Sequence, residues 1–504
     1  MTNRTPYPLN KGLYLLVLVA GGASVLAFSP FGFFPIVFIS PVILFYSLTK
    51  ATSTKQYFYL SWLFGVGLFS AGASWPFYSL YFFAHAPLPV AIVGVAFFVI
   101  LVALFSTGLF GLLAAQFRVL PLILRLLIFY PVSWVFIEWT RTWLFTGFPW
   151  LYFGNSLIDT VFSSFAPLFG VFGVSLVVVF ISGAILSLIL GTSKQRLISV
   201  VLIICAVVSA FLLHDISWTQ KKGKELRVSV LQANISQDDK LNPQKLEWAL
   251  EQYQTMTLQS LDSDIVVWPE TALFAPFGQY MESIIIPLQK KLRSGQSVLI
   301  GGFYINEDGG VENSVLGITS DSREIYSKRH LVPFGEYIPL LEYIRWMGDW
   351  IPYSNITAGK NNGTLAVAGE LAQMTICYED AFGAEIIQSL PEATLLINVT
   401  HDGWFSGSIE PEQHMQIARM RSLETGRYMV RATTTGPAGI IDEKGNVLVT
   451  APQYTKKTIT HKIQPFTGET PYVRWGNWLI ISLLSVILTI GALWNRKEKH
   501  IWQH

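Results

Sequence analysis

Charged residues are scarce in this chain. Asp, Glu, Lys and Arg make up 13% of its 504 residues, whereas soluble proteins carry roughly 25%. Hydrophobic residues make up 51%, and the mean hydropathy is +0.43. The deficit of charge argues against a soluble enzyme and indicates a membrane protein. The formal net charge of +2 is too small to indicate a nucleic-acid partner.

Cysteine is almost absent, because the chain holds only Cys205 and Cys377. Cys205 lies inside the apolar run SVVLIICAVVSAFLL (199–213), so a disulfide to Cys377 is not expected. Cys377 is therefore interpreted as a free thiol. Its position alone leaves two readings open, a small buried hydrophobe or a reactive group.

Recognised motifs for bound ions and cofactors are also lacking. His401, Asp402 and His414 do not form a known metal-ligand spacing, and no phosphate loop or dinucleotide fingerprint occurs. We therefore expect neither a metal nor a cofactor.

Long apolar runs are plentiful. A membrane-spanning helix needs about 20 apolar residues. Such runs occur near 11–28, 31–48, 57–80, 90–116, 121–140, 166–190, 196–213 and 477–494. The sequence thus predicts a membrane domain over 1–213 with seven transmembrane helices, and a last transmembrane helix over 477–494. The first run lacks a small-residue cleavage site, so it is expected to remain as an anchor.

Lys and Arg in the short connections predict the orientation, because cytoplasmic loops carry an excess of them. If the N-terminus is cytoplasmic, the outside connections contain only Arg141. The inside segments then carry all of the other loop cations: Arg4, Lys11, Lys50, Lys55, Arg118, Arg125, Lys194, Arg196, Arg496, Lys497 and Lys499. This asymmetry places both termini in the cytoplasm and the long polar region, about 214–476, outside.

The polar region alternates β-prone runs with amphipathic segments. Strands are expected within 225–235, 264–270, 297–305, 372–379, 394–402 and 438–448, and helices within 241–261 and 410–426. Such alternation predicts a layered α/β domain, in which reactive residues sit at the carboxyl ends of strands. Glu270 ends DIVVWPE and Cys377 comes late in AQMTIC. Lys328 precedes a loop that contains Pro and Gly.

These three residues carry a resemblance to a known superfamily. WPE (268–270), SKRHLVPFGEY (327–337) and CYED (377–380), in that order, resemble the Glu–Lys–Cys set of the nitrilase superfamily. The resemblance implies a four-layer α-β-β-α sandwich over 225–465. Apolar helices, then this domain, then one last helix resemble the bacterial apolipoprotein N-acyltransferases over nearly the whole chain, as does FTGFPWLYFGNSLID (145–159).

The resemblance implies an activity, which is the final step of lipoprotein maturation. The family moves an acyl chain from a phospholipid, such as a phosphatidylethanolamine-like lipid, to the N-terminal amine of a diacylglyceryl apolipoprotein. By position, Cys377 would be the nucleophile and carry a thioester, Glu270 the general base and Lys328 the oxyanion stabiliser. Three further residues match ones that the family requires: Glu336, expected to hold Lys328, and Tyr378 and Glu379, with Glu379 in an orienting role.

The resemblance also implies a multi-pass protein of the bacterial inner membrane with a periplasmic catalytic domain. No coiled coil is expected, so the chain is predicted to be a monomer.

One departure from the family pattern stands out, because the family has a tryptophan in the loop after the first strand. Here that loop reads SQDDKLNP (236–243), and the next tryptophan is Trp248.

Aromatic residues suggest how lipid reaches the thiol. The segment 331–353 is rich in Leu, Ile, Trp and Tyr, and Trp346 and Trp350 are spaced i,i+4. We interpret it as an amphipathic lid at the bilayer surface, with ordinary core packing as the alternative. TALFAPFGQY (271–280) and HDGWFSG (401–407), which contains Trp404, would form other walls. Asp380 is expected on the surface or in a local turn.

Two rival functions remain at this point. A membrane-tethered amidase or nitrile hydrolase would use the same triad with water, but eight spans are too many for a tether. A transporter with an outer domain would place ionisable residues within its spans. Few are found there, and Glu138 and Arg141 near one edge fit lipid head-group binding better than a pore.

Overall fold

The computed structural model describes residues 9–339 and 355–501. The chain forms two compact units. The helical unit comprises Met1–Tyr81, Ala86–Ile216 and Trp475–His504, and the sandwich unit comprises Phe82–His85 and Ser217–Arg474. The predicted lid tryptophans Trp346 and Trp350 lie outside the described residues.

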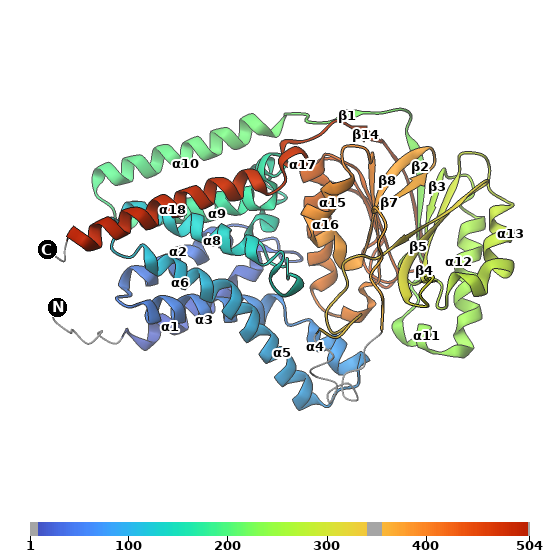
Figure 1. Ribbon diagram of the computed structural model, residues 1–504, viewed down its shortest axis with the longest axis horizontal. Coiled ribbons are helices and arrows are strands. Elements are labelled where there is room, and N and C mark those ends of the chain that lie inside the picture. The colour runs from blue at the N-terminus through green and yellow to red at the C-terminus, as the bar shows by residue number, and fades with distance from the viewer. Residues whose placement is uncertain (1–8, 340–354, 502–504) are drawn as a thin grey trace. The chain divides into compact units, whose positions relative to one another are not determined.

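The helical unit holds the apolar runs. Its main helices are α1 (Lys11–Ala23), α2 (Ile36–Lys50), α3 (Thr54–Gly72), α5 (Leu88–Ala103), α6 (Leu109–Gln116), α8 (Tyr130–Thr140), α9 (Ala166–Leu190), α10 (Ser193–His214) and α18 (Trp478–Ile501). They are drawn in blue, cyan, green and red in Figure 1. Among the residues that the structure describes, five helical stretches are long and apolar enough to cross a membrane: Leu88–Gln116, Leu122–Thr140, Val161–Leu190, Ser193–His214 and Trp478–Asn495.

The prediction of a membrane protein is therefore confirmed, while the count of eight spans stays a prediction. Two of the predicted spans form the shorter apolar helices Lys11–Ala27 and Ile36–Lys50. At about 1.5 Å per residue, the 15 residues of α2 reach only about 22 Å, less than a hydrocarbon core of about 30 Å. The run at 57–80 gives α3, which ends at Gly72.

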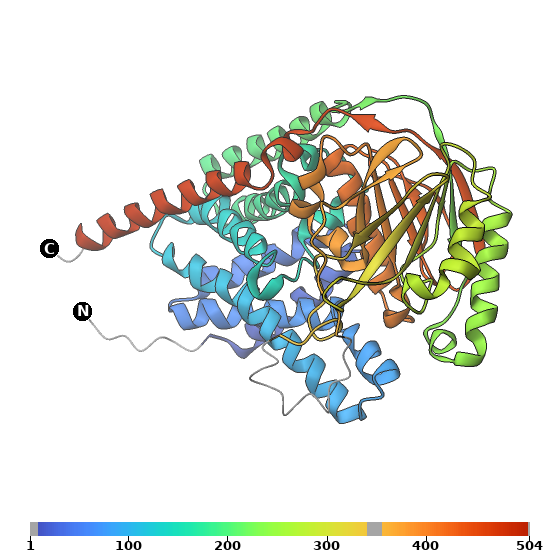
Figure 2. The ribbon, with the colours of Figure 1, turned by 45° about the vertical axis from the view of Figure 1, so that its right-hand side comes forward.

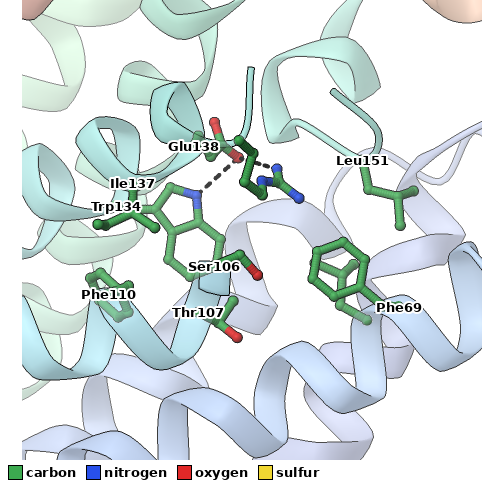
Figure 3. Close-up of a pocket in the computed structure, with 10 residues that line it drawn as sticks. Phe69, Ser106, Thr107, Phe110, Trp134, Ile137, Glu138 and Leu151 are labelled. Atoms are coloured by element: carbon green, nitrogen blue, oxygen red, sulfur yellow. Dashed lines mark hydrogen bonds and ion pairs between the residues drawn. The ribbon is translucent and has the colours of Figure 1, made fainter. Parts of the chain in front are cut away.

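Glu138 and Arg141 are buried inside the helical unit, with 4% and 6% of their surfaces exposed. Glu138 accepts hydrogen bonds from Trp134 Nε1 and the Phe153 backbone N–H, each at 3.1 Å, and Arg141 donates to the Trp150 carbonyl at 3.1 Å. The cavity beside them measures about 10 Å³, room for about one water (Figure 3). The expected head-group site is thus wrong for this pair, which ties α8 to the segment after it.

The sandwich unit contains two six-stranded sheets. The first has the order β13-β2-β3-β4-β5-β6, with β13 (Lys457–Ile463), β2 (Leu226–Gln232), β3 (Ile265–Val267), β4 (Ser297–Ile305), β5 (Val311–Thr319) and β6 (Arg323–Ser327). The second has the order β12-β11-β10-β9-β8-β7, with β12 (Val447–Thr450), β11 (Gly439–Ile441), β10 (Met429–Thr433), β9 (Leu395–Thr400), β8 (Glu370–Ile376) and β7 (Thr364–Val367). A short pair, β1 (Gln220–Lys221) and β14 (Phe466–Thr467), completes the unit.

Three apolar layers hold the unit together. Alternate residues of both sheets, such as Val230 and Ile397, form a core between the sheets. A second core packs α12 (Leu246–Leu258) and α13 (Ile286–Gln289) on the first sheet, and a third packs α15 (Gly383–Ile386) and α16 (Glu410–Thr425) on the second. Figures 1 and 2 show this order of helix, sheet, sheet and helix. The predicted four-layer sandwich is confirmed.

Each predicted strand segment overlaps a strand, with two changes of detail. Strand β8 ends at Ile376, so residues 377–379, which were expected in the strand, lie in the helical turn Cys377–Ala381. Residues 438–448 contain β11 and reach the start of β12, which pair antiparallel through a turn at Asp442–Gly445, rather than forming a single strand. Strands β2, β3 and β4 run parallel, as do β8, β9 and β10. Their carboxyl ends gather the loops that carry the candidate site.

Candidate active site

Cys377 directly follows β8 and adopts a left-handed backbone with φ of +52°. Such a conformation costs a non-glycine residue on the order of 1–3 kcal/mol and is typical of functional sites. Two contacts hold the turn in place. Asn398 donates to the Cys377 carbonyl at 3.2 Å, and the Ile376 N–H donates to Glu379 at 2.7 Å. The half-buried Cys377 thus lies on a turn at the end of β8 that these two hydrogen bonds hold in place.

Glu270 lies three residues beyond the end of β3 and is 6% exposed. Its loop packs directly on the backbone of β4, because a Cβ at Gly301 would lie 2.2 Å from the Pro269 carbonyl oxygen. Asn313 of β5 donates to Glu270 Oε1 at 2.7 Å. The carboxylate is therefore held in place by a hydrogen bond from β5, two strands away in the sheet.

Lys328 follows β6 and is 1% exposed. Its ammonium donates to the Glu336 carboxylate at 2.9 Å. Glu336 also accepts from Asn313 Nδ2 at 3.2 Å and from the Val332 N–H at 2.8 Å. Asn313 thus links Glu270 to Glu336, and Glu336 lies against Lys328 as the sequence led us to expect.

The charges of the three predicted residues influence one another. Burial raises the pKa of Cys377 well above its usual range, and the charge of Glu270 raises it further while Lys328 lowers it. Burial also raises the pKa of Glu270, with Lys328 opposing. Burial alone would lower the pKa of Lys328, but Glu336, Cys377 and Glu270 raise it. These shifts favour the protonated forms of the Cys377 thiol and the Glu270 carboxyl, and the charged form of Lys328.

Glu379 is fully engaged as an acceptor. One carboxylate oxygen accepts from Tyr326 Oη and the Ile376 N–H, each at 2.7 Å. The other accepts from the N–H groups of Arg329 at 2.7 Å and His330 at 3.1 Å. Glu379 therefore joins the turn before Cys377 to the residues after Lys328.

Tyr378 and Trp404 lie on the loops after β8 and β9. The half-buried Tyr378 ring packs edge-on against Phe382, with centroids 5.0 Å apart. Trp404 is 42% exposed and its ring edge lies near His401, with centroids 6.2 Å apart. The interpretation of Trp404 as part of a wall for the substrate stays a prediction.

Asp380 was expected on the surface or in a local turn; it lies in the short helical turn Cys377–Ala381, but the expectation of a surface position is wrong. Its carboxylate is fully buried and pairs with Arg431 at 3.2 Å and with His414 Nε2 at 2.7 Å. Arg431 also pairs with Asp402 at 3.1 Å and donates to Asn398 at 2.8 Å. Asp380 is inside because two cations from distant parts of the sequence neutralise it there.

Asp402, Glu410 and His414 come close enough to hold a metal ion, since one ligand atom from each lies within 4.8 Å of the others. The raised pKa values of His414 and Glu410 disfavour the binding of a metal ion there. Burial and Arg431 oppose a charged His414, but Asp380 and Asp402 raise its pKa to about 10. Burial and Asp402 raise the pKa of Glu410 to about 8. Metal ligands must be deprotonated, and Arg431 already supplies the cation.

The sequence alone did not single out Asn313 or Asn398. Each is a polar residue inside a run that forms a buried strand, which was a usable signal. Asn398 stands in TLLINVTHD. A buried side-chain amide among apolar residues needs a hydrogen-bond partner, so its presence predicts a polar contact. Asn313 stands in VENSVLGIT, which was not recognised as a strand.

Two known families match this chain. Residues 20–184 match the apolipoprotein N-acyltransferase N-terminal domain, and residues 227–472 match the carbon-nitrogen hydrolase family. Among solved structures, a CN-hydrolase superfamily protein from Xanthomonas campestris is 19% identical, with a TM-score of 0.37, and the likeness covers 48% of this chain and 91% of that chain.

Curated relatives extend over nearly the full length. The apolipoprotein N-acyltransferase of Methylococcus capsulatus is 39% identical, with 97% of each chain covered. That of Coxiella burnetii is 36% identical over 95% of this chain and 99% of its own, and that of Nitrosomonas europaea 37% over 94% and 95%. With both halves matched and its length covered, the chain belongs to the apolipoprotein N-acyltransferase family.

Proposed function

We propose that this chain transfers a fatty acyl group from a phospholipid to the N-terminal amine of a diacylglyceryl apolipoprotein through a thioester on Cys377. The observation that carries the proposal is the meeting of Cys377, Glu270 and Lys328, whose charges act on one another at the carboxyl ends of strands from both sheets. Membership of the acyltransferase family supports it.

In the first half-reaction, Glu270 accepts the thiol proton as Cys377 Sγ attacks the ester carbonyl of the lipid. The tetrahedral oxyanion collapses, the C–O bond breaks, and the lysophospholipid leaves with the proton from Glu270. Because the thiol pKa is raised, little thiolate exists beforehand. A base whose own pKa is raised by burial suits this transfer.

In the second half-reaction, Glu270 takes a proton from the neutral amine of the apolipoprotein as the nitrogen attacks the thioester. The C–S bond breaks, an amide forms, and the leaving thiolate regains the proton. One base therefore serves both steps. Lys328 and the backbone N–H of Tyr378 would stabilise both oxyanions, and one such donor is worth about 3–4 kcal/mol of barrier.

The charge of the connecting loops supports a location. With eight crossings, which count the two short apolar helices and α3, both termini lie in the cytoplasm and the sandwich unit in the periplasm. Both substrates, a phosphatidylethanolamine-like donor and a lipid-modified protein, then reach the site from the inner membrane. We take the working unit to be a monomer.

The test is mass spectrometry of the intact purified chain incubated with phosphatidylethanolamine, with Cys377→Ser as the matched variant. We expect the mass to rise by one acyl chain in the natural chain alone. Hydroxylamine should remove the adduct, and a diacylated lipopeptide should discharge it with formation of a triacylated product.

Each other outcome rejects part of the proposal. Discharge by water alone makes the protein a lipid hydrolase. An adduct that persists in Cys377→Ser places the acyl group elsewhere. Absence of any adduct with a set of phospholipid head groups removes the thioester and reopens the transporter interpretation.

A further inference from the structure

A second lysine lies beside the proposed base. Lys240 belongs to α11 (Gln237–Leu241), in the segment where the resemblance implied a tryptophan. Its Nζ donates to Thr271 Oγ1 at 2.9 Å and to the Glu270 backbone carbonyl at 3.4 Å. Lys240 therefore binds the turn that carries Glu270 through two neutral acceptors.

That turn is one that needs support. Thr271 has φ of +47°, and a β-branched residue in the left-handed region is a steric outlier. The strained residue directly follows the base, so any relaxation of its backbone would turn the Glu270 carboxylate away from Asn313. The two hydrogen bonds from Lys240 oppose this relaxation.

A second contact anchors α11 itself. Gln237 Oε1 lies 2.6 Å from His401 Nε2, on the loop after β9. Gln237 and Lys240 are three residues apart, so both project from one face of the short helix. The helix thus connects the loop after β3 in the first sheet with the loop after β9 in the second.

The charges around the pair define what Lys240 does to Glu270. Besides Lys240, Glu270 faces Lys328 and Glu336, and the nearby Cys377. Lys240 faces Glu270 and the buried His401, whose pKa burial holds well below its ordinary value. Burial lowers the pKa of Lys240 to about 7, so its positive charge is largely present only below that pH. There it favours the ionised form of Glu270, against the effect of burial.

We propose that Lys240 is a positioning residue for the acyl transfer described above: it holds the Glu270–Thr271 turn so that the Glu270 carboxylate can accept the Cys377 proton. The inference rests on the proposed function for its biological meaning. Its physical content, a lysine that holds the turn of the base and favours its ionised form, is measurable without any lipid.

The experiment compares Lys240→Met with Lys240→Arg in the full-length chain carrying Cys205→Ser, so that Cys377 is the only thiol. Lys245→Met is the control, because Lys245 is an exposed lysine that pairs with Asp239. The readout is the rate of alkylation of Cys377 by iodoacetamide from pH 5 to 9. A second readout is the rate of acyl-adduct formation with phosphatidylethanolamine.

Loss of the lysine charge removes one influence that lowers the pKa of Glu270, so the acid limb of the alkylation profile should move to higher pH in Lys240→Met. At pH 6 this makes acylation about tenfold slower through kcat, with KM for the lipid little changed. Lys240→Arg, which keeps the charge, should restore the position of the limb, and Lys245→Met should match the unsubstituted chain.

The outcomes separate this inference from the proposed function. An equal loss of rate at every pH with an unmoved limb means a merely structural role, and a profile like that of Lys245→Met means no role; both overturn the inference. A shifted limb in a chain that never acquires an acyl group keeps the positioning role and rejects the acyltransferase mechanism. Normal acylation with an unmoved acid limb keeps the acyltransferase mechanism and rejects the positioning role of Lys240.

Discussion

Asn313 Nδ2 lies 2.7 Å from Glu270 Oε1, and the same nitrogen lies 3.2 Å from Glu336 Oε1. One amide therefore serves the proposed base and the carboxylate that lies against Lys328. Asn313 sits on β5, whose backbone carbonyl at the same residue accepts from the Lys328 N–H at 2.8 Å. A single strand position thus sets the spacing between the three charged groups.

Substitution Asn313→Ala removes this shared donor. A hydrogen bond to a charged group contributes about 1.5–3 kcal/mol, so we expect kcat/KM for acyl transfer to fall by about 10- to 100-fold. Asn446→Ala is the matched control, because Asn446 is exposed and bonds only to Asp442. Equal activity of the two variants would show that Asn313 does not orient Glu270.

Substitution Glu336→Gln tests whether this carboxylate maintains Lys328. The change leaves a buried ammonium without its anionic partner, and breaking a buried pair costs about 3–5 kcal/mol. We expect acylation to fall by at least about 100-fold, together with a lower melting temperature. Glu312→Gln serves as a control on β5, next to Asn313 but on the opposite face of the sheet, where Glu312 accepts from Asn306. If Glu336→Gln kept most of the acylation rate, Glu336 would be a carboxylate that supports only its own loop and does not maintain Lys328.

Much of the site was predictable because local rules placed it. Glu270 and Cys377 each follow an apolar run that forms a buried strand, and strand ends carry reactive groups in such sheets. The two-sheet fold followed from the alternation of runs and the family resemblance. Lys328 needed the resemblance, because a lysine in a polar loop carries no signal of burial.

The remainder depended on contacts that sequence spacing does not encode. Glu379 and Asp380 are adjacent acids. Glu379 accepts from four donors, at the ends of β6 and β8 and just after Lys328, whereas Asp380 pairs with Arg431. Only the parallel pairing of β8, β9 and β10 brings Arg431 to Asp380. The sequence gives no signal for Lys240 either, since its proposed role depends on the contacts of α11 with the loops after β3 and β9.

The orientation of the chain is testable by labelling single cysteines. In a chain carrying Cys205→Ser and Cys377→Ser, we introduce Ser320→Cys in the exposed turn between β5 and β6, or Lys194→Cys in the predicted cytoplasmic loop. A maleimide that cannot cross membranes should label the first in intact spheroplasts and the second only after lysis. The reverse pattern would place the sandwich unit in the cytoplasm.

The last prediction concerns pH and the buried network behind Cys377. Asp380 and Asp402 raise the pKa of His414 to about 10, above its ordinary value near 6.5. The folded state therefore binds this proton more tightly than the unfolded state. The stabilisation is fully present below about pH 6.5 and is lost as the pH rises toward 10.

We expect the melting temperature of the natural chain to fall between pH 7 and 10, and to fall less steeply in His414→Gln, which is less stable at pH 7 because Asp380 and Asp402 lose a cation. His461→Gln, on the half-buried edge strand β13, is the control and should keep the natural slope. The measurement is calorimetry in one detergent at several pH values. Parallel slopes for the natural chain and His414→Gln would mean that His414 is neutral in the folded protein. Arg431 would then be the cation that pairs with both Asp380 and Asp402.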